Sequence, residues 1–255
     1  MIRFESVSKS FGPKQVLRGL DLVIPDGETT VILGYSGTGK SVALKLICGL
    51  LAPDEGRVIV DEQVVHQLDR DELVRLRGDI GFVFQFAALF DSMTVAENIR
   101  LGLVKRGLET SIVEERIRES LALVDLAGSE ERYPAELSGG MRKRVGIARA
   151  IALRPRYILY DEPTTGLDPV TSAVIDILMV RTNRELGVTG VVVTHDLRSA
   201  FTVGHRLAML YQGAIRQVGP VDEMRASDDP VVRQFLEGRP GQSTEEDPMV
   251  GAAVP

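Results

Sequence analysis

An α/β fold with an inserted helical subdomain is expected from three features of the sequence. A glycine-rich segment at residues 34–40 stands between a β-rich run and a helix-compatible run. Two almost continuously apolar runs, at 157–160 and 190–194, suit central strands of a sheet that is covered on both faces. Between these two groups, residues 86–152 change to helical periodicity, which predicts a helical subdomain inserted into the sheet-based core.

The remaining elements follow from local patterns of apolar residues and turn residues along the chain. Strands are expected wherever a short β-rich run ends in glycine, proline or a charged residue, and helices wherever apolar residues recur every three or four positions. We expect strands at 2–7, 16–24, 28–33, 57–60 and 80–84, helices at 41–51, 69–77, 95–104, 112–126 and 142–153, a hairpin of 207–211 with 214–218, and a last helix at 231–236.

Length and composition favour one compact domain. The chain has 255 residues, of which 44% are hydrophobic, enough for one large core but not for two full domains. We place the domain at residues 1–236, with the helical subdomain at about 86–152 inserted in it. Residues 237–255 are rich in glycine, proline, serine and acidic residues, so we expect a flexible C-terminal tail.

Charge and hydropathy exclude two classes of protein. With 30 basic and 36 acidic residues the formal net charge is −6, so no broad positive field exists to hold a nucleic acid, and we expect no nucleic-acid partner. No stretch reaches the roughly 18 to 20 consecutive apolar residues that a membrane-spanning helix needs, and the N-terminus lacks the apolar region of a signal peptide. The single cysteine, Cys48, fits a reducing compartment. We therefore expect a soluble, cytoplasmic protein.

The glycine-rich segment matches the P-loop pattern of Gly, four residues, Gly, Lys and Ser or Thr. Its glycines let backbone N–H groups turn inward around phosphates, and the following helix directs its positive dipole end at the same oxygens. Lys40 would neutralise β- and γ-phosphate charge, and the Ser41 hydroxyl would bind Mg²⁺. A glycine-rich turn without a ligand is the alternative. The nucleotide-binding residues expected here are Gly34, Tyr35, Ser36, Gly37, Thr38, Gly39, Lys40, Ser41 and Val42.

Two adjacent carboxylates, Asp161 and Glu162, end the apolar run at 157–160. Beside a P-loop, Asp161 would support Mg²⁺, directly or through water, and Glu162 would polarise the attacking water as a general base. Adjacent residues on a strand point in opposite directions, so the two carboxylates can take separate tasks. A solvated turn after a core strand is the alternative explanation of this pair.

The segment 137–141, Leu-Ser-Gly-Gly-Met, narrows the choice among P-loop proteins. It opens a helix about twenty residues before the acidic pair. Ser138 is a good N-cap, and Gly139 and Gly140 allow close approach, so this helix start is a second anion site. With this segment the sequence resembles the ABC ATPase family over about residues 2–236. The resemblance implies an ABC nucleotide-binding domain, with a RecA-like P-loop core, an antiparallel β subdomain and an inserted α-helical subdomain, that binds ATP and Mg²⁺.

The resemblance also implies roles for residues that the sequence alone leaves open. Gln85 matches the Q-loop, which senses Mg²⁺ and faces the transmembrane partner, and His195 matches the switch histidine, which contacts the γ-phosphate and orients the water. Asp168 matches the D-loop, which communicates across the dimer, and Phe11 matches the aromatic residue that stacks on adenine. Taken singly, Gln85 would more often be a polar strand end, and core packing is the alternative for Phe11. The predicted catalytic residues are Lys40, Gln85, Glu162 and His195, and the predicted metal ligands are Ser41, Gln85 and Asp161.

Partners are implied in the same way. In the family, the signature segment of one subunit closes on the γ-phosphate held by the P-loop of the other, so a second copy of this chain is expected. The sequence looks like the Mla/Mce-type lipid-transport ATPases in four places: segments 37–42, 88–95 and 229–238, and Met141 after the signature glycines. That branch implies integral-membrane permease subunits, an Mce-domain lipid-binding protein, phospholipid or a related lipid as cargo, and in some members a small STAS-domain regulator. The location would be the cytoplasmic face of the inner or plasma membrane.

Two other functions stay open. The branch-specific segments also fit an importer-type ABC transporter for another substrate. A soluble ABC ATPase without a membrane partner is the third class, but such relatives carry long coiled coils or two cassettes in one chain, and this sequence has neither.

Overall fold

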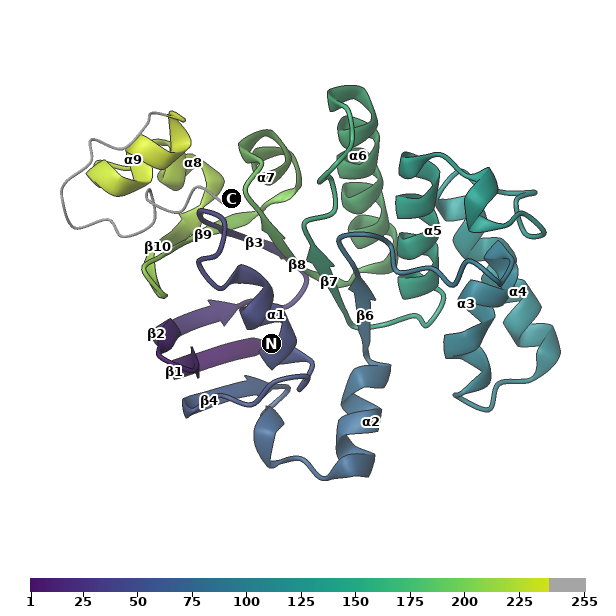
Figure 1. Cartoon of the computed structure of the whole chain (residues 1–255), viewed down its shortest axis with the longest axis horizontal. Helices are drawn as coiled ribbons and strands as arrows, with labels where there is room; N and C mark the ends of the chain where they lie inside the picture. The colour runs from purple at the N-terminus through teal and green to yellow at the C-terminus, as the bar shows by residue number, and fades with distance from the viewer. Residues whose placement is uncertain (239–255) are drawn as a thin grey trace.

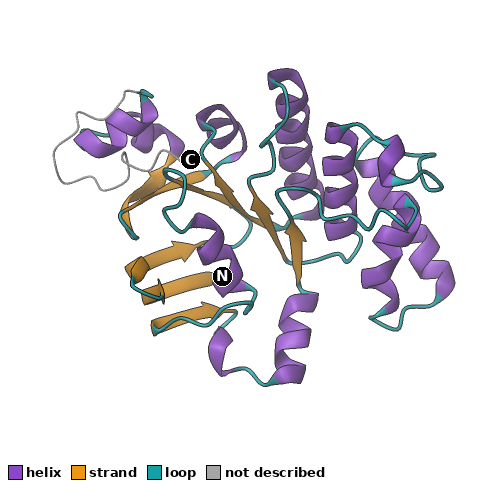
Figure 2. Ribbon diagram, viewed as in Figure 1, coloured by secondary structure: helices purple, strands orange, loops and turns teal. Residues whose placement is uncertain are grey.

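The computed structural model describes residues 1–238 as two sheets with flanking helices (Figures 1 and 2). The smaller sheet is antiparallel, with the strand order β2–β1–β4–β5. It confirms the antiparallel subdomain expected near the N-terminus. Its strands are β1 (Ile2–Phe11), β2 (Lys14–Ile24), β4 (Glu55–Val60) and β5 (Gln63–Val64).

The larger sheet has six strands in the order β10–β9–β3–β8–β7–β6. Strands β9, β3, β8, β7 and β6 run parallel to one another, and β10 is antiparallel to β9. Every residue of β3 and β8 is buried, as their apolar sequences predict for strands covered on both faces. The strands are β3 (Thr29–Leu33), β6 (Ile80–Val83), β7 (Tyr157–Asp161), β8 (Thr189–Thr194), β9 (Arg206–Tyr211) and β10 (Ala214–Pro220).

Helices cover both sheets. The three helices α3, α4 and α5 come between β6 and β7 in the chain, and in Figure 1 they stand at the end of the larger sheet that lies away from β1 and β2. No helix within residues 1–238 is long and apolar enough to cross a membrane. The helices are α1 (Lys40–Ile47), α2 (Arg70–Gly78), α3 (Val95–Val104), α4 (Thr110–Leu123), α5 (Gly139–Ile151), α6 (Pro169–Leu186), α7 (Leu197–Val203), α8 (Val221–Arg225) and α9 (Pro230–Leu236), with short 3-10 turns at Val65–Gln67 and Pro134–Glu136.

Local sequence explains where several helices begin and end. Thr94 and Ser138 cap α3 and α5, each accepting a hydrogen bond from the backbone N–H three residues later. Helix α5 therefore begins at Gly139, as the N-cap prediction for Ser138 requires and three residues before the periodic segment 142–153. Helix α1 ends at Ile47, earlier than predicted, because Gly49 has a φ of +64° and turns the chain out of the helix.

The long helix α6 is the main element that the sequence analysis missed. It carries apolar side chains on its exposed face as well as its buried face: Val170 and Ile177 are exposed, whereas Ile175 and Met179 are fully buried. An apolar residue on each face removes the one-sided stripe by which an amphipathic helix is recognised. The short helices α7 and α8 were not predicted either. Residues 239–255, most of the expected tail, lie outside the described residues.

The topology gathers the predicted site at one edge of the larger sheet. Because β3, β6, β7 and β8 are parallel, their carboxyl ends meet at the same edge. In open α/β sheets this edge is where ligands bind. The segments that follow these four strands contain the P-loop, Gln85, Glu162 and His195.

Candidate functional site

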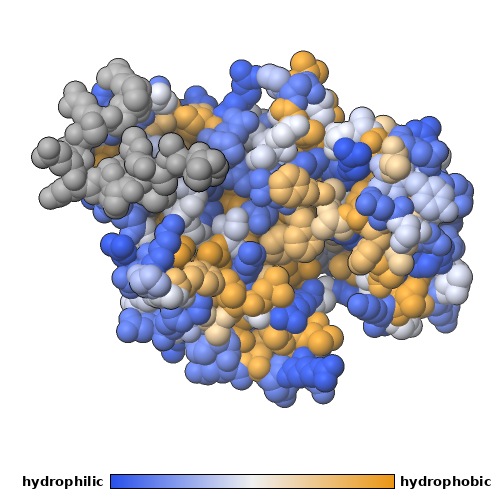
Figure 3. Space-filling model, viewed as in Figure 1, coloured by the Kyte–Doolittle hydropathy of each residue, from blue (hydrophilic) through white to orange (hydrophobic). Residues whose placement is uncertain are grey.

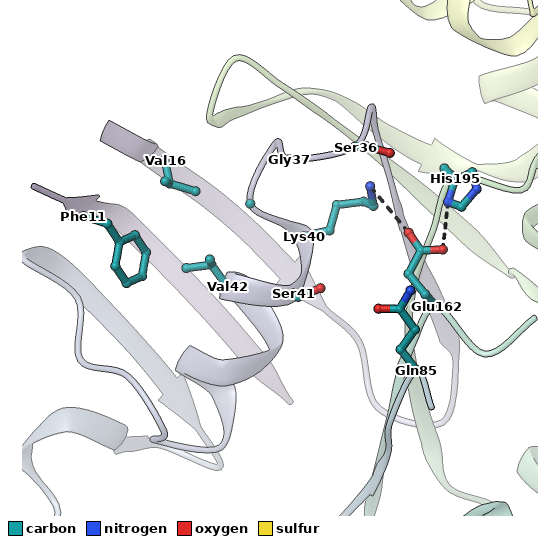
Figure 4. A pocket seen from close by; sticks show the side chains of 11 residues that line it. Phe11, Val16, Ser36, Gly37, Lys40, Ser41, Val42, Gln85, Glu162 and His195 are labelled. Carbon is teal, nitrogen blue, oxygen red and sulfur yellow. Dashed lines mark hydrogen bonds and ion pairs between the residues drawn. The ribbon is translucent and has the colours of Figure 1, made fainter. Parts of the chain in front are cut away.

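A cavity of about 400 Å³ opens at this edge, between the two sheets (Figure 4). A volume of this size is typical of small-molecule sites. Among residues 1–238, Val16 is the one lining residue that the sequence analysis did not single out. The lining residues are Phe11, Val16, Ser36, Gly37, Gly39, Lys40, Ser41, Val42, Gln85, Glu162 and His195.

The glycine-rich loop is shaped by close backbone contacts. Gly39 has a φ of +104°, and a Cβ there would lie 2.8 Å from the Val16 side chain, so only glycine fits. The Thr38 hydroxyl donates to the Tyr35 carbonyl oxygen at 2.8 Å. Lys40 Nζ donates to the carbonyl oxygens of Gly34 at 2.9 Å and Tyr35 at 3.0 Å, which holds the ammonium within the loop.

Glu162 lies at the centre of the polar contacts in the cavity (Figure 4). Its Oε1 is 3.7 Å from Lys40 Nζ, and its Oε2 is 2.8 Å from His195 Nδ1 and accepts a hydrogen bond from the Thr165 hydroxyl at 3.1 Å. The side chains of Lys40 and Glu162 are only 6% and 12% exposed. Burial lowers the pKa of Lys40, and the Glu162 and Asp161 carboxylates oppose that shift.

The backbone at Glu162 is strained. Its φ is +47°, in the left-handed region that side chains other than glycine seldom adopt. Such strain persists only where the surrounding contacts over-determine the conformation, and it concentrates at functional sites. The Glu162 N–H donates to the Val193 carbonyl oxygen of β8 at 2.9 Å, which fixes the turn after β7 against the neighbouring strand.

Ser41 and Asp161 form an oxygen pair that suits Mg²⁺. The Ser41 hydroxyl donates to Asp161 Oδ1 at 2.7 Å, which joins the start of α1 to the end of β7. Hydroxyl and carboxylate oxygens are the donors that Mg²⁺ prefers, and it is typically held by one or two carboxylates together with substrate phosphates. Within residues 1–238 no group of three or more His, Cys, Asp or Glu is placed to hold a metal. This donor set therefore fits a nucleotide-bound Mg²⁺ rather than an all-protein metal site.

The signature segment lies outside the cavity. Ser138 and Gly139 are exposed, and none of residues 138–140 belongs to the cavity lining of the described chain. The Ser138 hydroxyl accepts a hydrogen bond from the Met141 N–H at 3.2 Å, so it caps its own helix. A Cβ at Gly140 would lie 2.5 Å from the Thr171 side chain of α6, so glycine at this position allows α5 to approach the start of α6 closely.

Asp168 belongs to the same exposed edge. Its Oδ1 accepts hydrogen bonds from the N–H groups of Val170 and Thr171, each at 3.0 Å, so it caps α6. Hydrogen bonds from the side chain and backbone of Thr171 lower the pKa of this carboxyl group. The structure thus places Ser138, Gly139, Gly140 and Asp168 together, but away from the cavity that Lys40 and Glu162 line.

The other predicted residues lie around the loop rather than on the cavity wall. Gly34 and Thr38 support the loop backbone, and Asp161 reaches the site through Ser41. The ring of Tyr35 meets the ring of Phe235 edge to face, with centroids 5.0 Å apart, so α9 packs against the glycine-rich loop.

Comparison with known proteins identifies the family. Residues 17–165 match the family model described as ABC transporter, which is more than half of the chain. The chain belongs to the ABC transporter family. It is an ATPase subunit of that family, and its fold is that of an ABC nucleotide-binding domain.

The names of relatives of this ABC protein refer to several different compounds. The chain is 42% identical over 239 residues to the probable ribonucleotide transport ATP-binding protein mkl of Mycobacterium tuberculosis, covering 93% of this chain and 67% of the relative. It is 40% identical to the chloroplastic protein TRIGALACTOSYLDIACYLGLYCEROL 3 of Arabidopsis thaliana, covering 93% and 74%. It is also 40% identical to the methionine import ATP-binding protein MetN of Bradyrhizobium diazoefficiens, covering 92% and 70%.

Solved ABC structures share its fold. A dimeric post-hydrolysis state of the ATP-binding cassette MJ0796 with ADP and Pi is 37% identical, with a TM-score of 0.78, and covers 87% of this chain and 99% of that one. The structure of cbiO1 from Clostridium perfringens, part of the ABC transporter complex cbiONQ, is 28% identical, with a TM-score of 0.82, and covers 92% and 94%.

Sequence reasoning missed three side chains that contact the site of this ABC subunit. Val16 supports Gly39, Thr165 donates to Glu162, and Lys143 of α5 contacts the segments that hold Gln85 and Glu162. Val16 and Thr165 carry no distinctive pattern. One feature of the sequence could have indicated that Lys143 is buried. It stands two residues before the apolar run 145–148, on a helix that packs against the sheet.

Proposed function

We propose that this chain is the ATP-hydrolysing subunit of an ABC transporter that moves lipid, and that it works as a head-to-tail dimer on a membrane permease. One observation carries the proposal: the P-loop residues Lys40 and Ser41 line the cavity, whereas the helix start at Ser138 is exposed outside it. A chain with two phosphate-binding features in different places is suited to share each nucleotide with a second copy.

Within one chain the geometry supports binding and activation of ATP. The ring of Phe11, 47% exposed, would stack on adenine, while the loop N–H groups and Lys40 hold the phosphates. Ser41, Asp161 and Gln85 would hold Mg²⁺, which when bound neutralises negative charge on the β- and γ-phosphate oxygens.

The hydrolytic step would depend on two neighbouring side chains. Glu162 accepts the proton of the attacking water, and His195, 2.8 Å from the Glu162 carboxylate, orients that water and contacts the γ-phosphate. Lys40 stands beside the same carboxylate and would neutralise charge on the γ-phosphate as it leaves.

Dimer closure would couple ATP binding to transport. A ligand shifts a conformational equilibrium only through its different affinity for the two states. Here that difference arises if the N-terminus of α5 meets the γ-phosphate of the other copy only in the closed dimer, with Asp168 signalling across the same interface. Reopening follows when hydrolysis breaks the bond to the γ-phosphate.

An apolar surface beside Gln85 supports a permease partner. Phe86 is 81% exposed, Phe90 is 55% exposed and Phe84 is 39% exposed, all within a few residues of Gln85. Figure 3 shows apolar side chains gathered in the middle of the face drawn in Figure 1. Exposed aromatic side chains in one segment are typical of a protein interface. A permease seated here would hold the chain at the cytoplasmic face of the membrane.

Lipid is the cargo that the branch-specific features favour. Residues 229–238, which resemble the Mla/Mce-type ATPases, form α9 and its cap, and one relative carries the name of a galactolipid. The same resemblance suggests an Mce-domain protein and, in some members, a STAS-domain regulator as further partners. The alternative is an importer for another substrate, which the 40% identity to a methionine import protein favours.

Purification of the transporter complex tests this function. We expect the tagged chain, extracted in mild detergent, to bring an integral-membrane protein with it, and phospholipid vesicles to stimulate the ATPase activity of the complex. Methionine and ribonucleotides serve as matched competitors. Stimulation by methionine rather than by lipid would favour the importer, and recovery of an active ATPase without any membrane protein would contradict the permease assignment.

A further inference from the structure

Lys143 is a buried lysine on the helix that carries the signature segment. It is 6% exposed, and it lies on the face of α5 that also buries Gly140 and Ile147, three residues before it and four residues after it. Lysine is almost never fully buried unless its ammonium is paired, because removing the charge from water is costly. Its position therefore requires partners, and the structure supplies them from two other segments.

Both partners are backbone carbonyl oxygens next to the cavity. Lys143 Nζ donates to the carbonyl oxygen of Gln85 in a short contact, and to the carbonyl oxygen of Glu162 at 3.4 Å. Within residues 1–238 the ammonium has no carboxylate within ion-pair distance. Burial lowers the pKa of Lys143, and the nearby charges of Glu162 and Asp161 oppose that shift. The ammonium thus serves chiefly as a hydrogen-bond donor to main-chain oxygens.

These two carbonyls belong to two separate segments at one edge of the larger sheet. Gln85 follows β6 and Glu162 follows β7, and the two strands are neighbours. The side chains of both residues line the cavity. Glu162 has the strained φ of +47°, so its carboxylate direction depends on contacts that hold its backbone. One contact comes from β8, where the Val193 carbonyl oxygen accepts from the Glu162 N–H. The Glu162 carbonyl oxygen accepts from the Thr165 N–H of its own turn at 3.3 Å and from Lys143 of α5 at 3.4 Å.

The same helix links this contact to the second anion-binding edge. Lys143 stands five residues after Ser138, little more than one helical turn, and both lie on one continuous helix. A shift of the α5 N-terminus on meeting another copy would therefore move the ammonium and the two carbonyls with it. We propose that Lys143 is a positioning residue for ATP hydrolysis, whose ammonium fixes the Gln85 and Glu162 backbones to the helix that meets the second subunit's nucleotide. This inference rests on the proposed roles of Glu162 and of the dimer.

Substitution of the lysine tests the proposal. Lys143→Met keeps the apolar stem and removes all three donors. We expect kcat to fall about tenfold to a hundredfold, because small displacements of a catalytic group are costly, while the Kd for ATP stays within about threefold. The measurements are phosphate release at saturating ATP and equilibrium binding of ATP. Lys105→Met, the same change at an exposed lysine, should leave both values as in the wild type.

Measuring how much ATP-bound dimer accumulates distinguishes a positioning role of Lys143 in hydrolysis from a general structural role of this residue. If hydrolysis fails while binding and closure persist, Lys143→Met should accumulate dimer on size-exclusion chromatography in ATP and Mg²⁺, as Glu162→Gln should. Lys143→Gln provides a milder variant in case the methionine variant does not fold. Its amide nitrogen is one bond closer to the backbone and carries two hydrogens, so we expect kcat about three- to tenfold lower.

Three outcomes would overturn the proposal. The first is a folded Lys143→Met whose kcat lies within about twofold of wild type. The second, where the methionine variant does not fold, is a Lys143→Gln whose kcat lies within about twofold of wild type. The third is a loss of kcat that is matched by an equal loss of ATP affinity or of the dimer. Glu162→Gln, measured in parallel, tests the proposed function by itself. If Glu162→Gln turns over at the wild-type rate, the assignment of Glu162 fails, whereas an inactive Glu162→Gln beside a fully active Lys143→Met contradicts only the inference about Lys143.

Discussion

The cavity and the exposed edge at the start of α5 are both suited to bind phosphate, but they are built differently. In the cavity, Lys40 and Glu162 are largely buried and lie within 3.7 Å of each other. At the edge, Ser138 is exposed and its hydroxyl accepts a hydrogen bond only from the helix it caps, among the contacts of residues 1–238. The difference teaches that the chain encloses one of these regions and leaves the other exposed, as the proposed sharing of each nucleotide with a second copy would require.

The largest effect is expected from Glu162→Gln, which changes the chemistry of the cavity without changing its shape. If Glu162 is the general base, kcat should fall about 10² to 10⁴-fold, or roughly 3 to 5 kcal/mol of barrier lowering, with ATP binding retained. Phosphate release and ATP binding measure the two effects separately. Glu185→Gln, at an exposed position on α6, is the matched control. Near-normal turnover in Glu162→Gln would show that the carboxylate is not the base.

A smaller effect is expected from Ser138→Arg, which changes the exposed edge and leaves the cavity intact. In the homodimer kcat should fall about 10²-fold, the usual cost of losing an aligned donor to transition-state charge, while monomer affinity for ATP stays the same. Ser111→Arg, at an exposed serine in the first turn of α4, controls for added charge and bulk. When Ser138→Arg is mixed with a P-loop variant such as Lys40→Ala, the mixed dimer should regain at most one working site. Full activity of Ser138→Arg alone would rule out a shared site.

The cavity could be predicted from sequence more fully than its surroundings. The strands before Gly34, Gln85, Glu162 and His195 are short apolar runs, and the rule that carboxyl ends of parallel strands share an edge brings these four residues together. The family pattern supplied their roles. The order of the strands and the contact distances required the structure, because strand pairing is set by packing between residues far apart in the chain.

Helix α6 and Lys143 show what sequence reasoning could not reach. The cap and turn signals of α6, Asp168 with Pro169 at its start and Gly187 at its end, were present in the sequence, but apolar residues on both faces hid the helical period. A lysine near an apolar run can equally lie with its ammonium in water. Only the fold reveals that the Lys143 ammonium reaches two carbonyl oxygens from other segments.

A buried carboxyl group, Asp176, lies between the two regions. It is on α6, which begins at the exposed edge, and its Oδ2 accepts a hydrogen bond at 3.0 Å from Ser199 of α7, the helix that follows His195. Its Oδ1 is buried without a hydrogen-bond partner among residues 1–238. Burial raises the pKa of Asp176 to about 6, with the Ser199 hydrogen bond opposing and the charge of Asp196 adding to the rise.

The smallest effect, on stability rather than on turnover, is expected from Asp176→Asn. Because the folded pKa lies above the unfolded value, the unfolded state binds fewer protons between about pH 4 and pH 6, so stability falls as pH rises through that window. At pH 8 the wild type should therefore have lost up to about 3 kcal/mol, and Asp176→Asn should be more stable than the wild type by about 1 to 3 kcal/mol. Near pH 4 the two proteins should unfold at similar urea concentrations, and Asp228→Asn, at an exposed position, should follow the wild type throughout. A variant less stable than the wild type at pH 8 would mean that the ionised carboxylate stabilises the joint between α6 and α7.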